Sequence, residues 1–331
     1  IIPLQSNRIH GIEYRAGGYL HPELLTWGSV IPEGPSIMVA GNQVSFDVVV
    51  DIRKEIPEGS KIGIMLHFVS DTDPFQTTDP LKPNFLSCES SLDDLVITAY
   101  NKPSRAGYFP YRRFAEIGWK GAAKCNTKMI FKFKNCFIQT YEETLFNIRF
   151  AILSNDNITG YIGDANFEIV GGEIHHLQLV APACMVPFEK GDCKIVVFDR
   201  YNNKSGSDLS KLKLNLRIVG SDEPLACEQI IYDKERRYHI AKGFKLRKEG
   251  VYYLEAGIGG NKSVTGISNP IIVRKNWDDK VYFGDLHQHS YYVDGRGVPA
   301  ANYEYAISTG CLDFLSMMDH LGGFFGPAMI R

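Results

Sequence analysis

Apolar and polar side chains alternate with a period of two along most of the first 275 residues. Val44, Phe46 and Val48 fall on one side of an extended backbone, whereas Ser45 and Asp47 fall on the other. Successive side chains of a strand point to opposite faces, so this pattern predicts strands with one buried face and one wet face. Strands of this kind are typical of antiparallel sheets.

The same alternation recurs further along the chain. Phe131 and Phe133 alternate with lysines, and residues 212–218 alternate aliphatic with polar side chains. Turn-forming clusters punctuate these runs, namely Pro57-Glu58-Gly59, Asn155-Asp156-Asn157 and Asn202-Asn203. Short alternating strands separated by such turns predict a mostly β chain built from β-sandwich domains.

A domain boundary is expected near residue 171. Gly171-Gly172 separates two strand-like segments, 165–170 and 175–180. We therefore expect one β-sandwich over residues 1–170 and a second, immunoglobulin-like sandwich over residues 171–275.

Residues 75–113 differ from the rest of the first domain. They are rich in Pro, Ser and Tyr and, apart from residues 95–100, show little sustained periodicity, so we expect a long loop excursion from the sandwich. Its aromatic residues include Tyr100, Tyr108, Phe109 and Tyr111. If exposed, they would favour a non-catalytic module that binds a glycan, a peptide or a partner subunit, although packing against the sandwich is the commoner role of such rings.

From Lys280 the pattern changes from all-β to strand, helix, strand. Residues 281–283 predict a short buried strand, residues 299–309 a helix with proline in its first turn, and residues 314–318 a second strand. A helix between two strands predicts parallel pairing with a right-handed crossover. The carboxyl ends of both strands should therefore lie at one edge of the sheet.

Three of the nine histidines fall between residues 287 and 320, beside these strand ends. His287 and His289 are two residues apart, so an extended backbone would project both imidazoles to one side, where they could share a cation. His320 follows the second strand and could add a third nitrogen. Each feature also has an ordinary interpretation: His-x-His is more often a pair of polar residues, Asp294-Gly295 is a common turn, and Asp319 could cap a helix.

In combination and order, these residues resemble the PHP family (polymerase and histidinol phosphatase). The likeness rests on residues 282–289, which read YFGDLHQH, on Asp294-Gly295, and on residues 312–320, which read LDFLSMMDH. It is closer to a branch in which the hydrolase barrel follows β-sandwich domains. The resemblance implies that residues 276–331 form the first β-α-β of a distorted β/α barrel. It also implies hydrolysis of a small-molecule substrate such as a phosphate ester.

The resemblance also implies roles for individual residues. His287 and His289 would be ligands of one divalent metal, His320 would be a ligand of a neighbouring one, and Asp294 would lie at or beside the cluster. Asp319 would not bind the metal itself but would contact these ligands and so assist the reaction indirectly. The implied cofactors are divalent ions of zinc, manganese or iron.

The chain departs from the family pattern in two places. Val293 stands where family members usually have serine or threonine. The family's later ligands belong to strands that would follow Arg331, so we expect an incomplete barrel. A barrel of this type needs roughly 200 residues or more.

The charge balance argues against a nucleic-acid partner, and the hydropathy argues against a membrane-spanning segment. Thirty-six basic and 38 acidic side chains give a formal charge of −2, which does not suit the broad positive surface of a protein that binds nucleic-acid polymers. No apolar run approaches the roughly 18 residues of a membrane span. We expect a soluble chain, either cytoplasmic or exported after removal of a leader, and a homo-oligomer through the β-sandwich domains is a further expectation.

Overall fold

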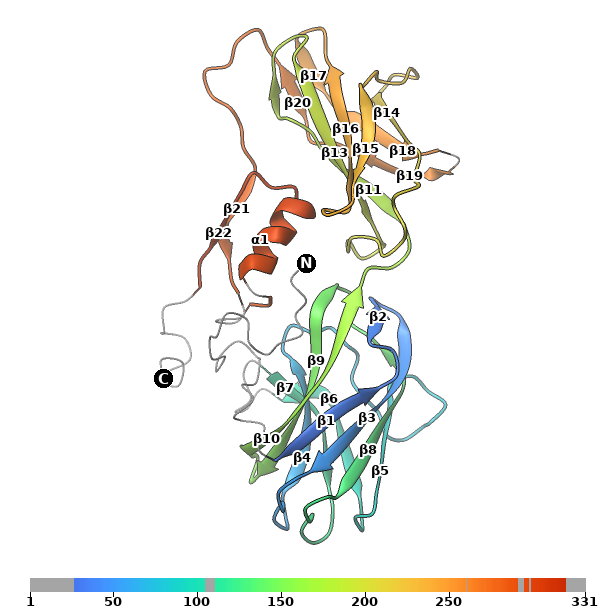
Figure 1. Cartoon of the computed structure of the whole chain (residues 1–331), viewed down its shortest axis with the longest axis vertical. Coiled ribbons are helices and arrows are strands. Elements are labelled where there is room, and N and C mark those ends of the chain that lie inside the picture. Colours follow the sequence, from blue (N-terminus) through green and yellow to red (C-terminus); the bar gives the residue numbers. More distant parts are fainter. Residues whose placement is uncertain (1–26, 105–110, 260, 291–294, 298, 320–331) are drawn as a thin grey trace. The chain divides into compact units, whose positions relative to one another are not determined.

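The computed structural model describes residues 27–104, 111–259, 261–290, 295–297 and 299–319 (Figure 1). Strands dominate the described chain, so the predicted mostly β class is confirmed. The chain divides into two compact units, which are described separately below. The first unit comprises residues 1–170, 289–297 and 319–331, and the second comprises residues 171–288 and 298–318.

Two sheets make up the first unit. The four-stranded sheet has the order β1-β3-β8-β5, from β1 (Gly28–Glu33), β3 (Gln43–Ile52), β8 (Lys128–Phe137) and β5 (Phe85–Ser90). The six-stranded sheet has the order β2-β10-β9-β4-β7-β6, from β2 (Ile37–Val39), β10 (Asn157–Val170), β9 (Glu143–Ser154), β4 (Lys61–His67), β7 (Tyr111–Gly118) and β6 (Val96–Ser104). Among the named strands of this unit, β2 and β10 pair in parallel and the other pairs are antiparallel.

One hydrophobic core lies between these two sheets. Phe131 of β8 contacts Phe150 of β9 with ring centroids 5.1 Å apart, and Phe46 of β3 meets Phe167 of β10 edge-on at 4.9 Å. On the other side of β8, Lys132 forms an ion pair with Glu89. The alternation predicted for these segments is therefore confirmed, because its apolar positions build the core.

The long loop excursion expected over residues 75–113 is wrong, because β5, β6 and the start of β7 fall within it. Two physical reasons explain why the periodicity was weak. The strands β5 and β6 lie at the ends of their sheets, where the outer side of β5 meets an isolated bridge from Gln76 to Phe85 in place of a further strand. In β7 the polar positions Arg113 and Glu116 are buried because they form an ion pair of 2.8 Å, so the strand lacks a wet face.

The second unit contains three small antiparallel or mixed sheets around a core of its own. The first has the order β11-β13-β16-β15, from β11 (His176–Val180), β13 (Lys190–Phe198), β16 (Tyr238–Lys245) and β15 (Gln229–Asp233). The second has the order β12-β20-β17, from β12 (Cys184–Met185), β20 (Ile271–Val273) and β17 (Gly250–Tyr252). The third has the order β14-β18-β19, from β14 (Leu214–Ile218), β18 (Leu254–Ile258) and β19 (Asn261–Ile267).

The second unit also carries a strand-helix-strand segment, from β21 (Gly284–Gln288), α1 (Pro299–Ser308) and β22 (Phe314–Met317) (Figure 1). The two strands pair in parallel, as predicted. The buried strand expected at residues 281–283 is wrong, since these residues lie before β21 and are exposed. The Phe283 amide donates to the Asp313 carboxylate at 2.8 Å, and regular pairing starts one residue later, where Gly284 faces Phe314.

Candidate metal centre

The two histidines of the His-x-His motif lie at the carboxyl end of β21. His287 is within the strand and exposed, and His289 follows the strand and is half-buried. Asp285 pairs with Leu315 and Gln288 pairs with Met317, so β21 has one residue more than β22 between these two pairs. This irregularity interrupts the strict alternation from which we predicted that the two imidazoles project to the same side.

Asp319, which follows β22 by two residues, holds the backbone just after His289. Its carboxylate oxygens accept hydrogen bonds from the Ser290 amide and the Ser290 hydroxyl, each 2.6 Å long. Ser290 is completely buried. Hydrogen bonds to an ionised acceptor are among the stronger ones in proteins, so this bridge fixes the chain beside a predicted ligand. The helix that Asp319 was considered to cap would fall on residues outside the described ones.

Gly295 packs against the same stretch of backbone. Its amide donates to the Ser290 carbonyl at 3.0 Å, and a Cβ at Gly295 would lie 2.2 Å from the carbonyl oxygen of His289. Only glycine fits so close an approach. Asp294 and His320 lie outside the described residues, so their implied roles as a metal-associated acid and a metal ligand stay predictions.

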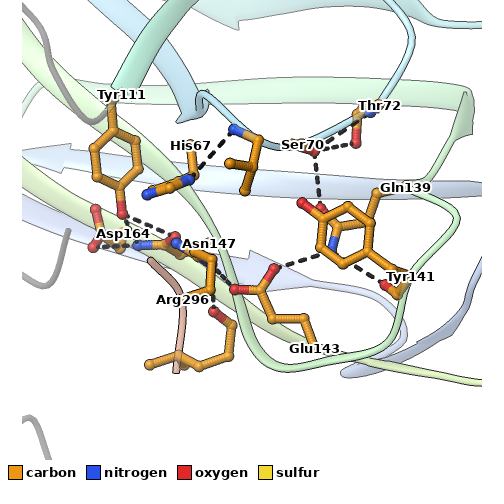
Figure 2. Close-up of polar contacts among 12 residues, drawn as sticks. His67, Ser70, Thr72, Tyr111, Gln139, Tyr141, Glu143, Asn147, Asp164 and Arg296 are labelled. Atoms are coloured by element: carbon orange, nitrogen blue, oxygen red, sulfur yellow. Dashed lines mark hydrogen bonds and ion pairs between the residues drawn. The ribbon is translucent and has the colours of Figure 1, made fainter. Parts of the chain in front are cut away.

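Arg296, which follows Gly295, contacts the start of β9 within the first unit. Its guanidinium forms an ion pair with the Glu143 carboxylate and donates to the Leu145 carbonyl at 3.2 Å (Figure 2). The Glu143 carboxylate also accepts a hydrogen bond of 2.9 Å from the side-chain amide of Gln139. Sequence reasoning missed both Arg296 and Glu143, because nothing in a local pattern links residues 153 positions apart.

The same six-stranded sheet carries a polar cluster. It contains Tyr111, Asn147, Asp164 and His67 (Figure 2), together with Arg149, which binds Asp164. Both oxygens of the Asp164 carboxylate accept hydrogen bonds of 2.9 Å from the Arg149 guanidinium, and the Asn147 amide donates to Asp164 and to the Tyr111 hydroxyl. Burial raises the pKa of Tyr111. Burial disfavours the charged form of Arg149, but the Asp164 carboxylate outweighs this effect and raises the Arg149 pKa.

His67 is the histidine of this cluster, and its pKa lies far below the usual value. Burial, reinforced by the charges of Arg296, Arg149 and Arg112, lowers the pKa of His67 to about 2. Its Nδ1 accepts a hydrogen bond from the Val69 amide at 3.4 Å, which places the proton of the neutral ring on Nε2. His67 is thus a neutral, buried residue and an unsuitable general base near neutral pH.

The described residues fit a divalent metal in donor type but supply only part of a ligand set. Imidazole nitrogen is a good ligand for zinc, manganese and iron. Within the described ranges, however, no three His, Cys, Asp or Glu side chains are grouped closely enough to hold an ion. A site with three protein ligands would therefore need His320 or Asp294 in addition to His287 and His289.

Comparisons with known proteins give only distant likenesses. No family model matches the chain, and no curated protein matches it. Among solved structures the chain is similar to the Escherichia coli adhesin FdeC, at 9% identity and a TM-score of 0.31, over 74% of this chain and 62% of the adhesin chain. It is also similar to a chimeric titin Z1Z2 carrying an exogenous decorin peptide, at 9% identity and a TM-score of 0.18, over 75% of this chain and 98% of the titin chain.

These likenesses are too weak to carry an argument about function. The chain spans less than two thirds of the adhesin. Within the described part of the chain, α1 is a short helix, and no helix has the length and hydropathy of a membrane span.

Proposed function

We propose that this chain belongs to a metal-dependent, phosphoesterase-like hydrolase of the PHP type. In this proposal the hydrolase part begins at β21, and the preceding β domains, the second of them immunoglobulin-like, are accessory. One observation carries the proposal. The strands β21 and β22 are parallel and joined by a helix, and the motif residues His289 and Asp319 follow their carboxyl ends by one and two residues. Ligands of β/α proteins bind at such ends.

The residues then divide into ligands and supports. His287 and His289 bind the cation through imidazole nitrogens, with His320 and Asp294 as further donors. When bound, a divalent cation supplies a Lewis acid and a water whose lowered pKa yields hydroxide near neutral pH. Asp319 accepts hydrogen bonds from Ser290 and so holds the backbone next to His289. Less conformational entropy is then lost when the cation binds.

Hydrolysis of a small aryl phosphate in the presence of Zn²⁺ or Mn²⁺ tests this proposal. The His287→Ala/His289→Ala double variant should lose turnover, because both imidazole donors are removed. The matched control is His175→Ala/His176→Ala, since these adjacent histidines lie in the second unit near β11 and outside the motif. The control should retain the activity of the wild type. Equal turnover in the wild type and the motif variant would contradict the proposal.

The alternative of a non-catalytic binding module loses part of its basis. Tyr111, one of the aromatics considered as an exposed surface, is buried and hydrogen-bonded to Asn147. Tyr100 is half-buried against Arg113, and Tyr108 and Phe109 lie outside the described residues. A homo-oligomer formed by the β domains stays a separate proposal, which light scattering of the purified chain would test through its mass.

A further inference from the structure

We infer that one end of the second β unit is a docking surface for membranes that contain anionic lipids, and that the ring of Phe188 inserts into them. Three segments form this surface, residues 186–190, 245–249 and 274–277, and together we call them the basic tip. All three belong to the second unit. The inference is independent of the proposed hydrolase activity, because none of the predicted metal ligands lies in the basic tip.

Hydrogen bonds and an ion pair hold the three segments of the basic tip side by side. The Phe188 amide donates to the Leu246 carbonyl at 2.8 Å, which joins the first segment to the second. An ion pair of 3.7 Å between Lys275 and Glu249 joins the third segment to the second. Side chains from all three segments therefore share one surface.

Phe188 has a backbone conformation that is unfavourable for an aromatic residue. It is the third residue of the β-turn Val186–Glu189, in which the Glu189 amide donates to the Val186 carbonyl at 3.2 Å. Its φ is 66°, and Pro187 precedes it. Glycine or asparagine is usual at this position of such a turn. Of the ten described non-glycine residues with positive φ, seven are Asn or Asp and only Phe188 is aromatic, so the local backbone does not explain the choice of phenylalanine.

The strained turn presents its aromatic ring to solvent. Phe188 is 63% exposed, although phenylalanine is usually found in protein cores. The amides of the turn are used internally, because the Val186 amide donates to the Glu189 carboxylate at 2.8 Å in addition to the two hydrogen bonds given above. Backbone strain persists where the surrounding structure fixes it, and it is concentrated at functional positions. The group that this turn offers to a partner is therefore the ring.

Basic side chains outnumber acidic ones around this ring. The exposed basic residues of the three segments are Lys190, Lys245, Arg247, Lys248, Arg274 and Lys275, and the exposed acidic residues are Glu189 and Glu249. Lys190 also pairs with the neighbouring Glu228 at 2.5 Å. The next acidic residues along the chain, Asp278 and Asp279, belong to the stretch that leads to β21. The basic tip thus carries an excess of positive charge, which is complementary to an anionic surface.

An exposed aromatic ring among long basic side chains suits the surface of a bilayer. Aromatic rings are favourable at the boundary between headgroups and acyl chains, and lysine and arginine side chains can extend from there to the phosphates. Basic residues are also attracted by the negative surface potential of anionic lipids. A folded acidic protein would be recognised through directed hydrogen bonds, and the amides of this turn are already used. The observations therefore favour anionic lipid as the partner.

The test is co-sedimentation of the full chain with vesicles of phosphatidylcholine and phosphatidylserine, and with vesicles of phosphatidylcholine alone. We expect the wild type to sediment with the first vesicles only, and added salt to release it. Phe188→Asn should lower the partition coefficient by about tenfold or more, because burial of the ring is lost. The same variant should unfold at an equal or higher urea concentration than the wild type, because asparagine tolerates the left-handed backbone. Phe188→Trp should keep the binding.

A second pair of variants tests the charges. Arg247→Gln/Lys248→Gln should lower the partition coefficient by more than about tenfold, because it removes two charges from the basic tip. Lys211→Gln/Lys213→Gln is the matched control, since it removes two exposed lysines from the segment before β14. Ile267→Asn is the control for the ring, since Ile267 is 58% exposed but lies in β19. Both controls should sediment as the wild type does.

Each outcome either supports or overturns the inference. Weaker sedimentation of Phe188→Asn and of the charge variant, with both controls unchanged, is the expected result. Equal sedimentation of the wild type and Phe188→Asn would overturn the insertion of the ring. A wild type that ignores phosphatidylserine, or that binds soluble polyglutamate whether or not Phe188 is present, would overturn the membrane as partner.

Discussion

The neutral state of His67 makes the stability of the first unit depend on pH. In the unfolded chain its pKa returns to the ordinary histidine value of 6.5, whereas in the folded unit burial and the nearby Arg296, Arg149 and Arg112 lower it to about 2. Below pH 6.5 the unfolded chain therefore binds a proton that the folded chain does not. Stability is fully present above this pH and is lost as the pH falls.

We predict a loss of up to about 1.4 kcal/mol per pH unit from this group as the pH falls from 6 to 5. Urea unfolding of the first unit at pH 7, 6 and 5 measures it, and His67→Gln should show a shallower dependence than the wild type. His175→Gln is the control, since His175 is an exposed histidine of the second unit, and it should keep the wild-type slope. An identical slope in the His67→Gln variant would refute the assignment.

At the residue scale, the sequence singled out the motif histidines, but it did not predict which polar side chains are buried. In β9, Asn147 and Arg149 alternate with the core residues Phe146, Ile148 and Phe150 and lie on the opposite face, yet both are buried. Their burial depends on Asp164 and Tyr111 from other strands. Alternation identifies the side of a strand that faces the core, but it does not tell what covers the opposite side.

At the scale of elements, the pairing of β21 with β22 depends on Gly284. This residue pairs directly with Phe314, and a Cβ at Gly284 would lie 2.4 Å from the Phe314 ring. We expect Gly284→Ala to destabilise the strand pair by about 1–3 kcal/mol, the usual cost of overpacking. Hydrogen exchange of the Met318 amide, which donates to the Gln288 carbonyl, reports on the pair directly.

The Gly284→Ala/Phe314→Ala double variant should regain part of the lost protection, because the clash is removed together with the ring. Gly118→Ala is the control, since the nearest atom to its new Cβ would be a Lys61 carbon at 3.7 Å, an ordinary contact. Unchanged exchange at Met318 in Gly284→Ala would show that the two strands do not pair in this register.

Element prediction succeeded where burial is one-sided and failed elsewhere. The strands around Phe46 and Phe131 alternate cleanly because one face meets the core and the other meets water. Edge strands such as β5 and β6 leave a weaker pattern, so residues 75–113 read as a loop. The apolar run at 281–283 read as a strand, although the side chain of Asp313 binds the Phe283 amide outside the ladder.

At the scale of the whole molecule, two β units accompany one parallel strand-helix-strand segment. The order of this segment followed from the sequence, because a proline begins the helix and apolar runs flank it. The sequence did not predict how this segment is divided between the two units. Residues 289–297 belong to the first compact unit, although they are far in sequence from its β-strands. The ion pair of Arg296 with Glu143 lies within this unit, and only three-dimensional structure reveals such a contact.

The central claim is that His287 and His289 bind a catalytic metal. Elemental analysis of the chain, purified without chelators or added metal, tests it most directly. The account predicts retained zinc, manganese or iron in the wild type and its loss in the His287→Ala/His289→Ala variant, with His175→Ala/His176→Ala unchanged. A metal-free wild type, or equal metal content in the wild type and the motif variant, would contradict it.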